Sequence, residues 1–258
     1  MIRDRKILLS FDVEEFDLPL EYKQPIPIEE QLETGYKGLV ALAEPLRMVP
    51  STLFTTAVFA EQFPGKTKEL SLMHEIASHS CFHSSFSPLD IKTSKEKLEA
   101  IIGKPVYGLR MPRMRQVDVE WVRDAGYRYN SSINPTWIPG RYNNWKSPRS
   151  FYVAGSVIQF PVSVTPRLRI PLFWLSFKNM PYHLFLQLAR QTLRHDGHLC
   201  LYFHPWEFCD LSGYRLPEYV KRGSNKKLSE KLLKLIKDLS GEGEFMTMNC
   251  FLNEKVFR

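Results

Sequence analysis

Short apolar runs of strand length alternate with longer amphipathic segments along most of this 258-residue chain. Residues 6–11 form a compact apolar run, and residues 28–46 then carry apolar side chains at helical spacing. The alternation continues with strand patterns at residues 51–59, 73–78, 106–110, 127–131, 158–162 and 199–204, and helical patterns at residues 93–102, 117–125, 182–195 and 226–239. Because such alternation favours a parallel sheet, the sequence predicts an α/β fold whose sheet is either open or closed into a barrel.

No linker, internal repeat or low-complexity stretch interrupts this pattern. Residues 135–150 are rich in Pro, Asn, Trp and Arg, which is typical of a rim or lid loop rather than of a domain boundary. We therefore expect residues 1–258 to form one domain, a length at which barrels often fold as a single unit.

Four polar residues stand at or just past the ends of predicted strands. They are Asp12, His79, Arg110 and His204. The carboxyl ends of parallel strands share one edge of a sheet or one mouth of a barrel, and active groups gather there. We therefore expect these four side chains to meet in a common cleft.

His79 and His83 are candidate metal ligands. Their spacing alone is weak evidence in a chain with seven histidines, and capping or core histidines are the plain alternative. Both lie in a Ser-rich turn after a predicted strand, where Ser80 and Ser84 are available as hydrogen-bond partners. Two imidazoles and a carboxylate form a divalent site that keeps positions open for water and substrate.

The carboxylate is expected from the acidic stretch after the first strand. Asp12 and Glu14 alternate along the strand end, so both project to the same side. Nearby carboxylates are costly unless a metal or a base neutralises them. The alternative is a solvated acidic turn, because Glu15 and Asp17 follow at once. In the metal interpretation, one carboxylate is a ligand and the other stays free as a base.

Arg110 and His204 complete the set, and each also has a structural interpretation. Arg110 is either an ordinary surface arginine or a fixed positive charge that orients a catalytic carboxylate. His204 is either a core histidine or a general acid whose pKa is tuned by burial beside Trp206.

Five segments in this order resemble the polysaccharide deacetylase family, the NodB-homology domain of carbohydrate esterase family four. The resemblance covers nearly the whole chain, and the Asp12–Glu14 spacing and the His-Pro-Trp-Glu ending are most similar to the subgroup linked to exopolysaccharide synthesis. The matching segments are residues 10–15, 49–56, 75–84, 109–112 and 202–207.

The resemblance implies a distorted (β/α)7-type barrel that removes the N-acetyl group from an amino sugar. It implies a divalent metal, zinc or a similar ion, held by Glu14, His79 and His83. It also implies the following roles for other side chains: Asp12 as the base oriented by Arg110, His204 as the acid, and Pro112, Tyr129 and Trp206 at the substrate, with Trp137 and Trp145 as further stacking platforms.

Two positions depart from the family pattern. Asn130 stands where the family often has an aspartate thought to tune the catalytic histidine, so we expect His204 to be less basic here. The metal carboxylate would be Glu14, which is longer than the usual aspartate, with Glu15 as a less favoured substitute.

Two other functions fit the same residues. One is hydrolysis of a small non-sugar amide, and the other is glycan binding by a catalytically inactive barrel. A complete set of base, acid and metal histidines argues against pure binding.

The remaining features bear on location and partners. No secretory signal pattern or membrane-spanning run is apparent, and the four cysteines show no Cys-x-x-Cys spacing, so we expect a cytoplasmic protein. The net charge of +7 is compatible with an anionic membrane surface, and residues 171–177 would suit peripheral contact if they were exposed, although burial is the favoured interpretation. No nucleic-acid recognition motif accompanies the charge.

Overall fold

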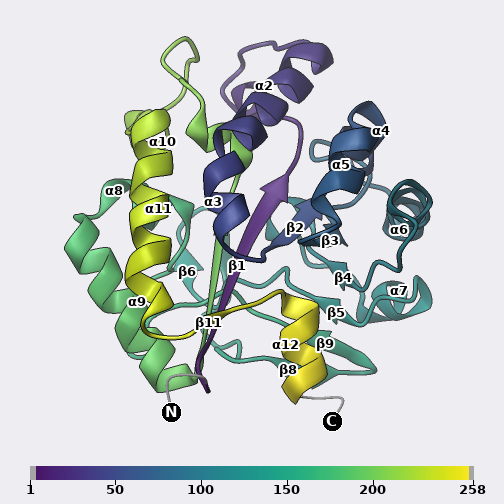
Figure 1. Cartoon of the computed structure of the whole chain (residues 1–258). Coiled ribbons are helices and arrows are strands. Elements are labelled where there is room, and N and C mark those ends of the chain that lie inside the picture. The colour runs from purple at the N-terminus through teal and green to yellow at the C-terminus, as the bar shows by residue number, and fades with distance from the viewer. Residues whose placement is uncertain (1–3, 256–258) are drawn as a thin grey trace.

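A curled sheet of seven parallel strands forms the centre of the molecule in a computed structural model, which describes residues 4–255 (Figure 1). The seven parallel strands run in the order β10, β1, β2, β3, β4, β5, β9. Their bounds are β1 Lys6–Val13, β2 Thr52–Thr55, β3 Glu75–Ser78, β4 Gly108–Leu109, β5 Tyr129–Asn130, β9 Val157–Gln159 and β10 His198–Phe203.

Four short strands lie outside this parallel series. β8 (Tyr152–Ala154) is antiparallel to β9 at one edge, and β11 (Glu244–Phe245) pairs with β1. β6 (Trp137–Ile138) and β7 (Tyr142–Asn143) form a separate hairpin within the stretch expected to be a rim loop.

The chain that follows β9 closes the ring. The backbone N–H of Ser163 donates to the carbonyl of Cys200 in β10 at 3.0 Å, and the Ser163 hydroxyl accepts from the Cys200 N–H at 2.9 Å. The irregular chain after β9 therefore lies along β10. This arrangement confirms the predicted distorted barrel.

Alternation along β1 divides its side chains between two environments. Ile7, Leu9 and Phe11 belong to the core between the sheet and the outer helices. Leu8 belongs to the core inside the barrel. The same parity sends Asp12 to the barrel interior, at the carboxyl end of the strand.

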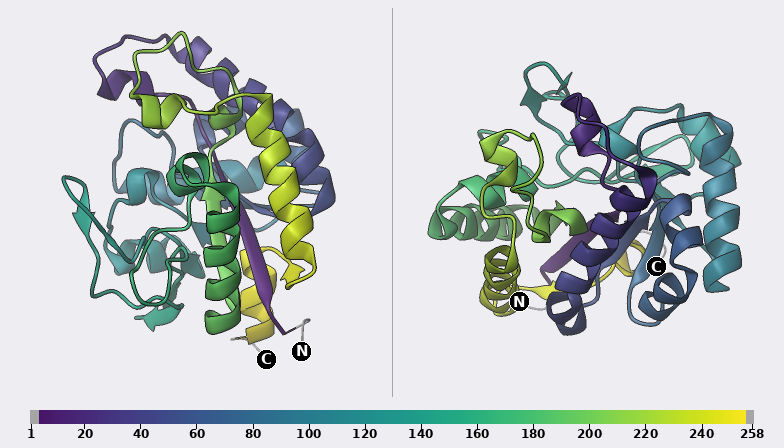
Figure 2. Two further views of the ribbon diagram at one scale, coloured as in Figure 1. Left: turned by 90° about the vertical axis from the view of Figure 1, so that its left-hand side faces the viewer. Right: turned by 90° about the horizontal axis from the view of Figure 1, so that it is seen from above.

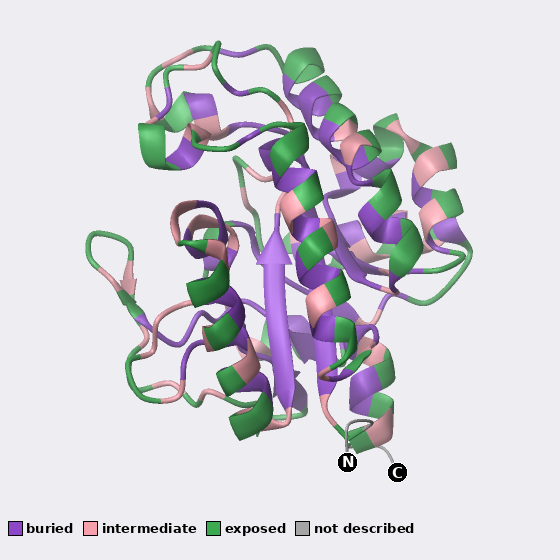
Figure 3. Ribbon diagram, turned by 60° about the vertical axis from the view of Figure 1, so that its left-hand side comes forward, coloured by how far each residue is buried: buried purple, intermediate pink, exposed green. Residues whose placement is uncertain are grey.

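Helices cover the outside of the sheet, with buried faces towards the strands (Figure 3). α12 (Met248–Lys255) lies at the opposite end of the barrel from the carboxyl ends of the strands (Figure 1). The other helices are α1 Leu18–Glu21, α2 Ile28–Ala41, α3 Ala43–Met48, α4 Ala57–Gln62, α5 Pro64–Leu70, α6 Leu89–Ile102, α7 Val119–Asp124, α8 Trp174–Asn179, α9 Tyr182–Asp196, α10 Glu218–Lys221 and α11 Lys226–Ser240.

Some predicted bounds were wrong. The strand expected at residues 51–59 ends at Thr55, because the Thr56 hydroxyl accepts from the Phe59 N–H and begins α4. The helix expected at residues 28–46 is divided into α2 and α3. Residues 171–177 are mostly buried, as the favoured interpretation predicted, with Leu172 and Phe177 inaccessible. None of the helices between residues 4 and 255 combines the length and apolar content needed to cross a bilayer.

Candidate active site

A cleft of about 300 Å³ opens at the carboxyl ends of the strands. Asp12 and Glu14 reach it from the end of β1, His79 and His83 from the turn after β3, and His204 from the end of β10. The structure thus brings these five predicted residues together. Arg110 lies beneath the cleft, fully buried.

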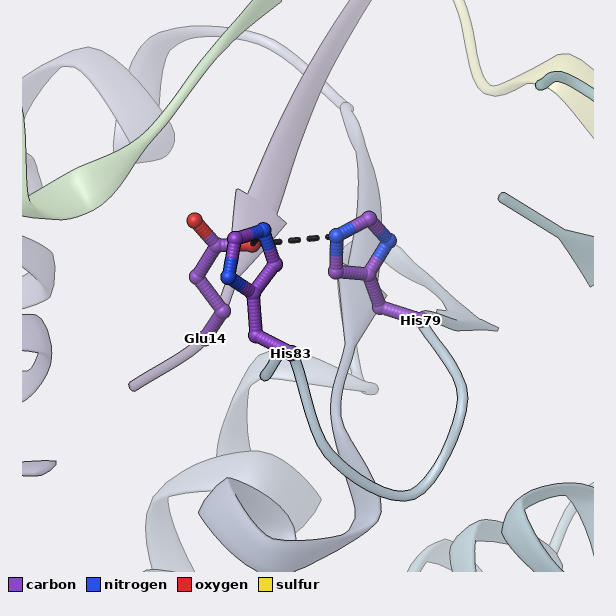
Figure 4. A group of neighbouring side chains, drawn as sticks. All are labelled: Glu14, His79 and His83. Carbon is purple, nitrogen blue, oxygen red and sulfur yellow. Dashed lines mark ion pairs between the residues drawn. The ribbon is translucent and has the colours of Figure 1, made fainter. Parts of the chain in front are cut away.

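Glu14, His79 and His83 converge on one point (Figure 4). Oε2 of Glu14 lies 3.0 Å from Nε2 of His79 and 3.4 Å from Nε2 of His83. One potential ligand atom from each residue lies within 4.8 Å of the others. Apart from the two histidines, no hydrogen-bond donor in residues 4–255 reaches this buried oxygen.

Each ligand side chain is held from behind. Nδ1 of His79 donates to the carbonyl oxygen of Arg110 at 2.7 Å, and Nδ1 of His83 donates to Oδ1 of Asp17 at 2.6 Å. The indole N–H of Trp206 donates to Oε1 of Glu14 at 3.0 Å. These bonds occupy Nδ1 of both imidazoles and leave their Nε2 atoms facing the free carboxylate oxygen.

The electrostatics of this group favour a positive charge at its centre. Burial raises the pKa of Glu14, but His83, His79 and His204 outweigh burial, and the net shift is downward. Burial lowers the pKa of His83, but Glu14 and Asp17 outweigh it and raise that pKa to about 9. A proton on His83 can supply the positive charge. Two imidazole nitrogens and one carboxylate are also a ligand set of catalytic zinc sites, so these residues fit a divalent ion.

Glu15 makes different contacts from Glu14. Its carboxylate accepts from the Thr56 hydroxyl at 2.8 Å and from the backbone N–H of His83 at 2.6 Å. These bonds fix the turn after β3 against β1. Of the two acidic residues considered as metal ligands, Glu14 is therefore the one that is grouped with His79 and His83.

Arg110 anchors Asp12 beside the Glu14–His79–His83 group. Its Nη1 lies 2.6 Å from Oδ1 of Asp12 and donates to the Ser10 hydroxyl at 3.1 Å. Nε and Nη2 of Arg110 donate to the carbonyl and the hydroxyl of Ser131 at 3.2 and 3.0 Å. Its guanidinium lies over the Phe54 ring, 4.0 Å from the centroid. The fixed, buried charge therefore orients Asp12 and leaves Oδ2 directed towards Nε2 of His204, 3.8 Å away.

His204 is held by Glu207. Oε1 of Glu207 accepts from the His204 backbone N–H at 2.7 Å and from Nδ1 of the ring at 3.0 Å. Trp206 stacks on the imidazole with a centroid separation of 4.8 Å, and Trp174 meets it edge-on at 5.3 Å. Nε2 is thus the ring atom free to exchange a proton with a molecule in the cleft.

Solved structures identify this architecture. An allantoinase, PuuE, aligns over 99% of this chain and 92% of its own, with a TM-score of 0.65 and 12% identity. A protein assigned as a polysaccharide deacetylase from Mycobacterium smegmatis aligns over 98% and 91% (TM-score 0.64, 17% identity). Another so assigned, from Pseudomonas aeruginosa PAO1, aligns over 99% and 93% (TM-score 0.63, 13% identity). The chain has the polysaccharide deacetylase fold.

Comparison of the sequence alone does not identify this fold, because no protein-family profile and no curated protein matches the chain. The expected resemblance is therefore confirmed through three-dimensional structure. The exopolysaccharide subgroup stays a prediction.

The pKa of His204 lies above its ordinary value, although Asn130 stands where the family often has an aspartate. Burial lowers the pKa of His204, but the hydrogen bond with Glu207 and the charges of Glu14 and Asp12 outweigh it, so the pKa is raised. Asn130 forms hydrogen bonds with Gln159 and Ser132 instead. Glu207 therefore places a negative charge beside His204, where Asn130 has none.

Two of the three expected substrate contacts do not line the cleft. Tyr129 is fully buried and donates its hydroxyl proton to Glu75 at 2.9 Å, while its ring meets Phe54. Pro112 is buried where the chain turns after β4. Trp206 does line the cleft.

Three residues for which the sequence predicted no role also surround the cleft. Asp17 is buried beneath His83, which contradicts the alternative of a solvated acidic turn. Trp174 forms part of the cleft wall but stands in an apolar run typical of a core. Glu207 had a detectable signal, because it follows His204 by three residues across Pro205, the spacing of a capping interaction.

Proposed function

We propose that this chain is a metal-dependent hydrolase that removes the N-acetyl group from an amino sugar in a glycan or glycan precursor. The observation that carries the proposal is the convergence of Glu14, His79 and His83 beside a base and an acid in one cleft. The likeness of the fold to polysaccharide deacetylases supports this assignment.

The proposed ion is zinc or a similar divalent metal. Bound by Glu14, His79 and His83, it would supply Lewis acidity towards the water and the acyl oxygen. The partners behind the three ligands would fix their orientation. These hydrogen bonds would hold the three side chains in place before an ion binds.

Asp12 and His204 divide the proton transfers. Asp12, held by Arg110, accepts a proton from the water whose oxygen bonds to the acetyl carbon. His204 donates a proton from Nε2 to the nitrogen as the carbon–nitrogen bond breaks. The products are acetate and a free amino sugar.

The dimensions of the cleft bear on the substrate. Its volume of about 300 Å³ is at the small end for ligand pockets, and the β6–β7 hairpin, α1 and α10 all contribute to its walls. We therefore propose that it accepts one amino-sugar unit, such as the end of a glycan or a lipid-linked or nucleotide-linked sugar. The same small volume favours hydrolysis of a small non-sugar amide as the second candidate.

The test combines metal analysis with acetate release from N-acetylglucosamine oligomers. Wild type should bind about one metal ion and release acetate, and His79→Ala should lose both properties. The matched control is His183→Ala, which removes an exposed histidine on α9 and should retain both.

The other outcomes are also informative. Bound metal with turnover of small amides but not of sugars would favour the second candidate. Folded wild-type protein that takes up no metal after reconstitution would contradict both catalytic proposals.

A further inference from the structure

Acidic residues are absent from more than a quarter of the chain. Between Asp124 and Asp196 there is no Asp or Glu, although the whole sequence contains 28. The same stretch includes nine Lys and Arg residues, namely Arg128, Arg141, Lys146, Arg149, Arg167, Arg169, Lys178, Arg190 and Arg194. Arg141, Arg149, Arg190 and Arg194 form ion pairs with acidic residues outside this stretch, so its unbalanced positive charge comes from among the other cations.

Large apolar side chains are exposed within this basic stretch. Trp137 is 61% exposed, Trp145 45% and Leu168 71%. The two tryptophans line a shallow hollow together with Lys146. The β6–β7 hairpin that begins with Trp137 stands out from the body of the molecule (Figure 2).

Arg169 ties the turn containing Leu168 to the base of the hairpin. Its Nη1 donates to the carbonyl oxygens of Pro135 and Ser147 at 3.0 and 2.8 Å. Its guanidinium also lies 5.7 Å from the centre of the Trp145 ring. The two exposed segments therefore form one surface, here called the aromatic–basic patch: Trp137, Trp145, Lys146, Arg167 and Leu168.

The cations of the aromatic–basic patch are available to a partner. Lys146 and Arg167 are exposed, and neither forms an ion pair within residues 4–255. Exposed tryptophans and an aliphatic side chain beside unpaired cations match a surface with negative charge outside and hydrocarbon beneath.

We propose that the aromatic–basic patch docks the protein on an anionic phospholipid surface. Lys146 and Arg167 would meet lipid phosphates, while Trp137, Trp145 and Leu168 enter the headgroup region. A glycan platform is less well supported, because the side-chain oxygen of the nearby Asn143 already accepts from the backbone N–H of Trp145 at 3.2 Å.

Docking here would bring the cleft to the membrane. The β6–β7 hairpin contributes Trp137 and Asn143 to the hollow, and Ile138, Arg141 and Tyr142 to the cleft. One short hairpin thus connects the two surfaces. The inference does not depend on the proposed deacetylase activity, because it rests on residues outside the metal-binding and proton-transfer groups.

Co-sedimentation with lipid vesicles tests the proposal. Wild-type protein should bind vesicles of equal phosphatidylcholine and phosphatidylglycerol, and bind phosphatidylcholine vesicles much less. Lys146→Glu/Leu168→Ser should weaken binding to the anionic vesicles at least about tenfold. The control Lys92→Glu/Leu89→Ser makes the same changes on α6, where Leu89 is 76% exposed, and should bind like wild type.

Trp137→Ser gives a second measurement. It should weaken binding at high salt as well as at low salt, because salt screens charge contacts but not apolar insertion. Equal losses in the patch and control variants, or no wild-type binding to anionic vesicles at low salt, would overturn the proposal. Saturable binding of N-acetylglucosamine oligomers that Trp137→Ser abolishes, without vesicle binding, would instead identify a glycan platform.

A parallel assay separates this inference from the proposed function. Acetate release from a soluble substrate should be the same in Lys146→Glu/Leu168→Ser and in its control. Absence of acetate release from every variant, with vesicle binding reduced only in the patch variants, would reject the deacetylase proposal and support membrane docking.

Discussion

Replacing Glu207 with glutamine isolates the charge that holds His204. Oε1 of Glu207 accepts both from the backbone and from Nδ1 of His204, and the side chain is fully buried. Glutamine keeps the size and one acceptor oxygen but removes the negative charge. A hydrogen bond to a charged group contributes about 1.5–3 kcal/mol, which corresponds to roughly a tenfold to hundredfold fall in kcat if His204 acts as an acid.

The direction of the pH effect follows from the same contact. Glu207 helps to raise the pKa of His204, so Glu207→Gln should lower it. An acid works only while protonated, and activity is lost as pH rises through its pKa. The alkaline limb of the kcat profile should therefore move to lower pH in the variant.

The assay is acetate release across pH, with urea unfolding of each variant. The control is Glu120→Gln, which removes an exposed carboxylate on α7 and should leave the profile unchanged. An unchanged kcat with an unchanged alkaline limb in a stable Glu207→Gln protein would refute the reasoning. A loss of stability without movement of the limb would show that Glu207 only supports the turn.

Two further predictions concern buried charge. Arg110→Met should reduce the free energy of unfolding by about 3–5 kcal/mol, because it leaves Asp12 buried without its partner. In urea unfolding, the additional change Asp12→Ala should recover part of this loss. Strictly additive losses would contradict the prediction. Burial lowers the pKa of His74 to about 4, below the 6.5 of an unfolded histidine. Between pH 6.5 and 4 only the unfolded chain takes up the proton. The free energy of unfolding should therefore fall by up to about 3 kcal/mol as the pH drops through this range. The His74→Gln variant should flatten this acid loss in unfolding measurements and exposed His183→Gln should not, whereas parallel pH curves for wild type and His74→Gln would count against the assignment.

Much of the site was predictable because its main residues occur at the ends of strands. Asp12 and His204 follow apolar runs whose length and composition indicate β-structure, and parallel strands bring their ends together. Strand parity also placed Asp12 and Glu14 on one side. Helix bounds were less predictable, because the Thr56 cap that ends the second strand depends on one side-chain hydrogen bond.

The sequence by itself predicted the alternating architecture, the candidate metal ligands and the candidate acid and base, since local spacing and strand position indicate each of them. Only the tertiary structure decided which partner holds each group. Arg110 meets Asp12 across 98 positions, and Asp17 meets His83 across 66. Burial makes an unpaired charge costly, so the partner is whichever group the completed barrel brings within reach, and no local pattern specifies it. Tyr129 was expected to contact the substrate, but the completed barrel encloses its side chain, which no local pattern indicated.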